Sequence, residues 1–163
     1  MIKKILVTLL FTLGILHAMG DNINYDDKFD QEENREVNRG LDNRLDNITL
    51  KSFVFQEKNG KNIPIKNVKV GAKVVYINKV TNSNSEARRD IVVKNPIPRG
   101  TKYVIGSAIC NGSCTISYSS NGGDSLTTNE SRGDIYNYIE FHFREIPAYK
   151  EFRMGFRAIV EKR

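Results

Sequence analysis

The feature that most constrains the fold is a strict alternation of apolar and polar residues near the carboxyl end of the chain. Every second residue of the segment 139–144 is Ile or Phe, and the segment 152–160 has apolar side chains at Phe152, Met154, Phe156, Ala158 and Val160. A period of two places successive side chains on opposite faces of a β-strand, so each strand has one buried face and one largely solvated face. The alternation therefore predicts antiparallel strands.

Short β-branched and aromatic runs alternate with turn residues in the preceding part of the chain, most clearly in residues 71–106. Pro96 and Pro98 end one of these runs, which is typical of strands and not of helices. Further strand-like runs occupy residues 48–55, 63–70, 72–81, 88–95, 101–107 and 110–119. Seven or eight strands within residues 47–163, with turn signals about every 8–12 residues, predict an all-β antiparallel β-sandwich.

One polar residue falls on a predicted inner face. In the run 72–81, Asn78 shares its face with Val74, Tyr76 and Val80. A buried amide needs hydrogen-bond partners, so we expect Asn78 to find one inside the sandwich.

The first twenty residues have the features of a signal peptide. Lys3 and Lys4 precede an apolar core at residues 5–16, and small residues follow it. A core of 12 residues is too short to span a bilayer, which favours a cleaved signal over a membrane anchor. We predict cleavage after Ala18 or after Gly20, and no membrane span in the exported mature chain.

The mature chain has an acidic front and a basic body. Residues 21–46 carry nine acidic and four basic side chains, whereas residues 47–163 carry ten acidic and nineteen basic ones. The acidic segment has few large apolar residues, so it is interpreted as a solvated linker or tail. Apolar residues near helical spacing also allow a short helix over residues 32–45, and the segment is alternatively a docking element that folds on contact with a partner.

Two cysteines lie four residues apart, at Cys110 and Cys114, around a turn-forming Asn-Gly pair. In an oxidising compartment this spacing favours a disulfide that pins a small loop. The rival interpretation is a metal site, but two thiolates with one histidine in the mature chain are too few ligands for zinc.

The order of several motifs resembles a bacterial envelope module, the domain of unknown function eleven, also called the conserved repeat domain. Its characteristic strand begins Gly-x-x-Val-x-Tyr and ends Thr-Asn, which Gly71, Val74, Tyr76, Thr81 and Asn82 match. A Pro-x-Pro-x-Gly turn at residues 96–100 and a Tyr-Val-x-Gly-Ser segment at residues 103–107 follow in the family's order. The resemblance covers about residues 70–160.

The chain departs from the family pattern at several points. Asn95 replaces an aspartate, Phe141 replaces a tryptophan, and the turn at residues 146–149 lacks its glycine. The resemblance implies an immunoglobulin-like fold in an exported or surface protein, with no catalytic residues. The family often occurs as repeats, whereas this chain has one copy.

Two sets of residues are candidates for contact with partners. Arg153 and Arg157 share one outward face of the last strand, and Arg144 is expected on a neighbouring strand, so the three arginines are a candidate site for anionic glycans or lipid headgroups. The alternative interpretation, which the sequence favours, is a solvated basic surface screened by the acidic segment 21–46. The tripeptide Arg132, Gly133 and Asp134, which integrins read, lies in a predicted exposed loop, although a simple turn is the alternative interpretation.

Catalytic chemistry finds little support in the sequence. His142 is the one mature histidine and is expected on a solvated strand face, and no nucleophile elbow lies near it. The acidic run at residues 26–33 lacks the order of a calcium loop. We therefore expect no enzyme, metal or other cofactor, and a small secreted hydrolase or metalloenzyme is the remote alternative.

The sequence thus predicts a periplasmic or cell-surface protein that acts in adhesion, envelope structure or protein–protein contact. Envelope or surface proteins or glycans are the expected partners, and nucleic acid is excluded by export. The alternative function is a subunit or accessory factor of a secreted assembly that docks through residues 21–46.

Overall fold

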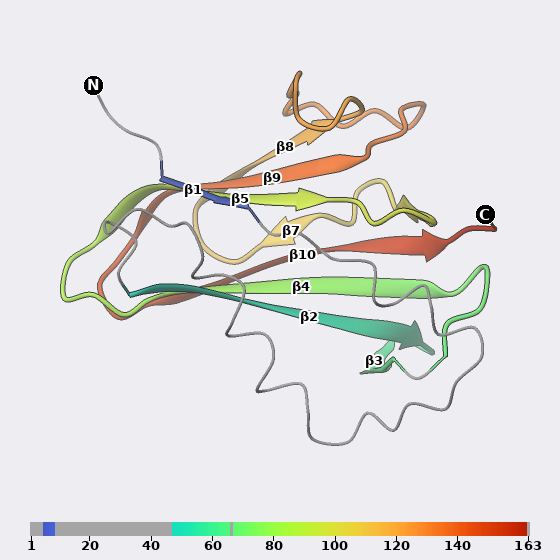
Figure 1. Ribbon diagram of the computed structural model, residues 1–163, viewed down its shortest axis with the longest axis horizontal. Helices are drawn as coiled ribbons and strands as arrows, with labels where there is room; N and C mark the ends of the chain where they lie inside the picture. The colour runs from blue at the N-terminus through green and yellow to red at the C-terminus, as the bar shows by residue number, and fades with distance from the viewer. Residues whose placement is uncertain (1–4, 9–46, 66, 163) are drawn as a thin grey trace.

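A computed structural model describes residues 47–65 and 67–162 together with the backbone of residues 5–8. The acidic segment 21–46 and most of the predicted leader lie outside these residues. The described part of the chain contains no helix, and its strands form two sheets that pack face to face (Figure 1). The predicted antiparallel β-sandwich is therefore confirmed.

The larger sheet has six strands. Its order is β3 (Lys61–Pro64), β2 (Ile48–Lys58), β4 (Lys73–Asn82), β10 (Glu151–Val160) and β6 (Thr101–Tyr103), with β7 (Ile109–Cys110) also pairing with β10. Every pairing in this sheet is antiparallel. Pro64 ends the edge strand β3, as expected from the missing amide hydrogen of proline.

The smaller sheet has four strands, in the order β1 (Ile5–Thr8), β5 (Arg88–Pro96), β9 (Tyr138–Ile146) and β8 (Cys114–Ser119). β5, β9 and β8 are antiparallel, whereas β1 lies parallel to β5 at the edge of the sheet (Figure 1). β1 falls within the predicted leader, and nothing in the alternation pattern of the sequence indicated this strand.

The core forms where the inner faces of the two sheets meet. The smaller sheet contributes Ile91, Val93, Ile139, Phe141 and Phe143, and the larger sheet contributes Val74, Tyr76, Val80, Met154, Phe156 and Ala158. Alternate residues of each strand supply these side chains, so the inner faces predicted for residues 139–144 and 152–160 are confirmed.

A chain of hydrogen-bonded polar side chains crosses this core from one sheet to the other. Ser52 Oγ on β2 donates to Asn78 Oδ1 on β4 at 2.7 Å, and Asn78 Nδ2 donates to Asn95 Oδ1 on β5. Both asparagines are fully buried, so each bond satisfies a group that water cannot reach. The expected partner of Asn78 therefore exists, and it belongs to the opposite sheet.

A third buried asparagine, Asn82, closes one end of the sandwich. Asn82 Nδ2 donates to the carbonyl oxygens of Glu86, Ile146 and Pro147 at 2.9–3.1 Å, and Asn82 Oδ1 accepts from the backbone nitrogen of Asn84 at 3.0 Å. The β4–β5 loop and the β9–β10 turn thus meet on one side chain.

Three tyrosines pack together beside the long loop that precedes β9. The ring centroids of Tyr103, Tyr118 and Tyr136 lie 5.2–6.3 Å apart. Tyr136 Oη accepts from the backbone nitrogen of Ser131 at 2.9 Å, a link to the backbone a few residues upstream that also occurs in the tyrosine corner of immunoglobulin-like domains. Burial raises the pKa of Tyr103 and of Tyr118, so both hydroxyls stay neutral at physiological pH.

Candidate functional site

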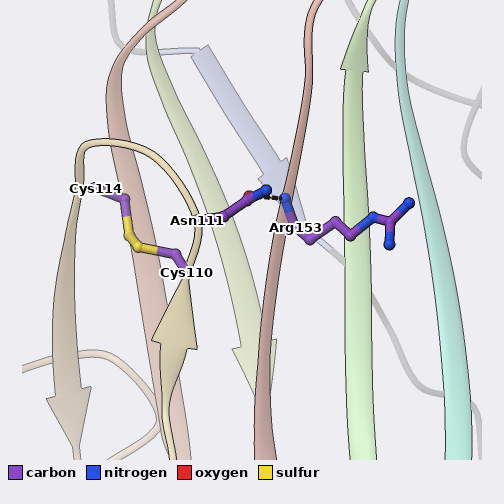
Figure 2. The surroundings of a disulfide bond; sticks show 4 residues. All are labelled: Cys110, Asn111, Cys114 and Arg153. Atoms are coloured by element: carbon purple, nitrogen blue, oxygen red, sulfur yellow. Dashed lines mark hydrogen bonds between the residues drawn. A yellow bond between two sulfur atoms is a disulfide. The ribbon is translucent and has the colours of Figure 1, made fainter.

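The disulfide predicted from the spacing of the cysteines is present, and it joins the two sheets. Cys110 lies in β7, which pairs with β10 of the larger sheet, whereas Cys114 begins β8 of the smaller sheet. Figure 2 shows the bond closing the loop between the two strands. The Cα atoms of the two cysteines are 6.6 Å apart. The bond therefore fixes the distance between the sheets at this edge.

The disulfide loop also docks on β10. Asn111 donates its backbone N–H to the carbonyl oxygen of Arg153 at 2.9 Å, and its side-chain Oδ1 accepts from the backbone nitrogen of Arg153 (Figure 2). Gly112 has a left-handed φ of 84° and lies against the ring of Phe152, where a Cβ would come within 2.8 Å of the ring. Phe152 in turn stacks on Phe143 of the smaller sheet, at 5.5 Å between centroids.

Replacing both cysteines with serine will lower the free energy of unfolding by about 2 kcal/mol, because closing a five-residue loop removes that much chain entropy from the unfolded state. Urea denaturation of the double variant, beside wild-type protein with and without reductant, measures this loss. Equal stability of the oxidised wild type and the double variant would contradict the structural role of the bond.

The outer face of the larger sheet carries a band of apolar residues between rows of charge. The register aligns Phe53, Ile77, Gly155 and Ile109 in one row across β2, β4, β10 and β7. The adjacent row contains Phe55, Val75 and Arg157. We call the apolar members of these rows, Phe53, Phe55, Val75, Ile77 and Ile109, the outer band. Ile109 is 63% exposed, Phe53, Phe55 and Ile77 are half-buried, and Val75 is buried.

The sequence contains a signal for the outer band that the strand prediction did not use. β2 has apolar residues on both parities: Ile48, Leu50 and Val54 face the core, whereas Phe53 and Phe55 point outward. A strand with large apolar residues on both parities has two apolar faces. An apolar outer face could therefore have been predicted for residues 48–55.

Charged side chains frame the outer band on both sides. Arg157 Nε lies 2.6 Å from Glu57 Oε2, and Lys79 Nζ lies 2.6 Å from Glu151 Oε2. The hydrogen bond from Arg157 lowers the pKa of Glu57, and the one from Lys79 lowers the pKa of Glu151, so both carboxylates stay ionised. The basic side chains in or beside these rows outnumber the two carboxylates, so the frame is net positive: they are Lys51, Lys73, Lys79, Arg153 and Arg157.

The structure separates the three candidate arginines. Arg153 and Arg157 share the outer face of β10, as predicted, and each contacts a glutamate. Arg144 lies on β9, which belongs to the smaller sheet and pairs with β5 and β8, not with β10. The expectation that Arg144 lies on a strand beside β10 is therefore wrong. The chain crosses between sheets in the short turn after Ile146, and alternation alone does not reveal such a crossing.

The tripeptide Arg132, Gly133 and Asp134 lies in the irregular loop before β9. The backbone nitrogen of Asp134 donates to the carbonyl oxygen of Ser131 at 3.3 Å, which places Arg132 and Gly133 at the tip of an exposed turn. Tyr136 Oη donates to the Asp134 carboxylate at 3.0 Å. The tripeptide is thus exposed, but the carboxylate of Asp134 is hydrogen-bonded to Tyr136.

The remaining candidate groups are dispersed. His142 lies on the outward face of β9 with Nε2 3.4 Å from Asp90 Oδ1. Nowhere in residues 47–65 and 67–162 do three His, Cys, Asp or Glu side chains gather as metal ligands would.

No segment of the described chain forms a helix of the length and apolarity needed to cross a membrane. Comparison of the chain with protein-family models, curated proteins and solved structures finds no match.

Proposed function

We propose that this protein is an exported, non-enzymatic β-sandwich module that acts through contacts in adhesion, envelope structure or protein–protein association. The resemblance of residues 70–160 to the conserved repeat domain and the signal-like leader support export. The disulfide between Cys110 and Cys114 is consistent with an oxidising compartment.

The single observation that carries a contact function is the outer band. Soluble monomers expose few contiguous apolar patches, and a patch rimmed by charged residues is typical of an interaction surface. In this protein Ile109 stands 63% exposed in line with Ile77 and Phe53, and the flanking rows carry net positive charge. The partner that fits this surface is an envelope protein or glycan with an acidic rim.

Reversing the charge of Arg157 will test the proposal. We expect Arg157→Glu to weaken binding to envelope partners and to immobilised heparin about tenfold. The new carboxylate would lie beside the outer band and repel the negative charges of these partners. The matched control is Arg144→Glu, which makes the same charge change on the opposite sheet and should leave binding unchanged. Equal loss in both variants would indicate a nonspecific charge effect, and no loss in either would refute the outer face as the contact surface. Thermal unfolding of each variant confirms the fold.

A second candidate function is docking of residues 21–46 to a secreted assembly. The charge asymmetry supports it, since these residues carry nine acidic side chains ahead of a basic body. Capture of envelope partners by the mature chain and by a chain lacking residues 21–46 separates the two functions. Docking through the acidic segment would be favoured if deletion of residues 21–46 abolishes capture while Arg157→Glu captures partners as well as the wild type does.

A further inference from the structure

The edges of the two sheets differ in how they are protected. A free edge exposes unpaired backbone groups that can pair with another strand, and proteins protect such edges with short strands, proline or covering loops. In the larger sheet the outermost strands are β3, which has four residues and ends at Pro64, and the short β6 and β7. These outermost strands are short, and β3 pairs with residues 55–58 of the longer strand β2 and not with the rest of it.

The β8 edge of the smaller sheet is covered. Thr127, in the loop that precedes β9, exchanges two backbone hydrogen bonds with Tyr118 of β8, at 2.8 and 3.0 Å. The loop thus occupies backbone groups that an added strand would need.

The β5 edge has a different cover. Its partner is β1, whose residues Ile5–Thr8 lie in register with residues 91–94 and parallel to them (Figure 1). β1 falls inside the predicted signal peptide. Removal of that peptide therefore takes away the strand that pairs with β5 on this side.

The open stretch of β5 is short and apolar. Asp90, with a left-handed φ of 55°, precedes it, and Pro96 follows it. Between them, Ile91 and Val93 point into the core, Val92 points outward, and Lys94 shares the outer face with Val92. A strand added here needs apolar residues opposite Ile91, Val92 and Val93, and an acidic or polar residue opposite Lys94.

We propose that the exported chain, without its leader, binds an extended segment of a partner protein along residues 91–94 of β5. The segment runs parallel to β5 and has three consecutive apolar residues followed by an acidic or polar one. Main-chain hydrogen bonds supply the affinity, and the side chains beside Ile91, Val92 and Val93 supply the selectivity, as in other cases of strand addition. This inference rests on the proposed contact function and on removal of the leader, and it uses a surface distinct from the outer band.

The test uses the mature chain recovered after export and a fluorescein-labelled peptide with the sequence of residues 3–10 as a probe. We expect saturable binding, slower hydrogen exchange at those amides of residues 91–94 that face away from β9, and about tenfold weaker binding of the same peptide with Leu6→Pro, which removes a backbone N–H and restrains the strand. The full-length chain should bind the peptide poorly, because β1 already occupies the edge.

Two lysine variants locate the bound peptide. Val92 on β5 and Thr115 on β8 both lie opposite His142 of the central strand β9, so the three residues form one row across the sheet. Val92→Lys should weaken peptide binding about tenfold, and Thr115→Lys should leave it unchanged. If the mature chain does not fold without β1, the full-length Leu6→Pro variant, whose β1 is weakened, provides the same test and should gain peptide binding.

Several results would overturn the proposal. These are a leader retained in the exported protein, bound peptide without protection of residues 91–94, equal binding by wild type and Val92→Lys, or a mature chain that dimerises through β5. If the peptide does not bind at β5 but Arg157→Glu weakens partner binding as expected, the outer band remains the contact surface. If the peptide binds at β5 and Arg157→Glu has no effect, the outer band is refuted and the β5 edge is retained.

Discussion

Replacing Asn82 with alanine will lower the free energy of unfolding by about 3–5 kcal/mol. The side chain is fully buried and donates to three carbonyl oxygens, of Glu86, Ile146 and Pro147. Alanine leaves these acceptors without that donor and leaves a cavity behind, and each buried unsatisfied group costs about 1–3 kcal/mol. Urea denaturation measures the change through its midpoint.

Two further variants make the Asn82 test specific. Asn82→Asp should be worse than alanine at neutral pH, because a carboxylate oxygen would face three carbonyl oxygens. Its deficit should shrink as the pH falls, since the protonated carboxyl is the form that the buried site favours. Asn62→Ala, on the exposed edge strand β3, should change stability by less than about 0.5 kcal/mol. Equal stabilities of Asn82→Ala and Asn62→Ala would contradict the closing role of Asn82.

Replacing Gly155 with alanine will lower the free energy of unfolding by about 3 kcal/mol. A Cβ at this position would collide with the backbone carbonyl oxygen of Tyr76 in the neighbouring strand β4. Because the obstacle is backbone, relief requires the β4–β10 pair to separate, and such overpacking costs about 1–3 kcal/mol or more. The same measurement of unfolding by urea applies.

Gly133→Ala is the matched control for Gly155→Ala. A Cβ at Gly133 meets no atom within 4 Å, and Gly133 has no left-handed φ. We expect a change within about 0.5 kcal/mol. A Gly155→Ala protein as stable as Gly133→Ala would show that β4 and β10 are not as close as described.

Period-two alternation predicted much of the fold, because it reports which side chains share a face. It predicted the inner faces of β9 and β10 and the inward position of Asn78. Asn95, the partner of Asn78, was also within reach, since it has the parity of Ile91 and Val93 in β5.

Alternation could not predict which strands are neighbours. β9 and β10 follow one another in the chain but lie in different sheets, which is why Arg144 was misplaced. The pairing of β1 with β5 was hidden for a similar reason, because a continuous apolar run in a leader carries no sign of its strand partner. The outer band was not predicted, although Phe53 and Phe55 have the opposite parity to Ile48 and Leu50 in β2 and therefore lie on the other face.

We propose that the protein acts by contact through the outer face of its larger sheet. The most direct measurement is site-specific photo-crosslinking in the producing cells, with a photoreactive residue at Ile109 or at Tyr149. Both side chains are well exposed, at 63% and 71%, but Tyr149 lies in the β9–β10 turn and not in the outer band. We expect a discrete adduct with an envelope component from position 109 and none from position 149. No adduct from position 109, or the same adduct from both positions, would contradict it.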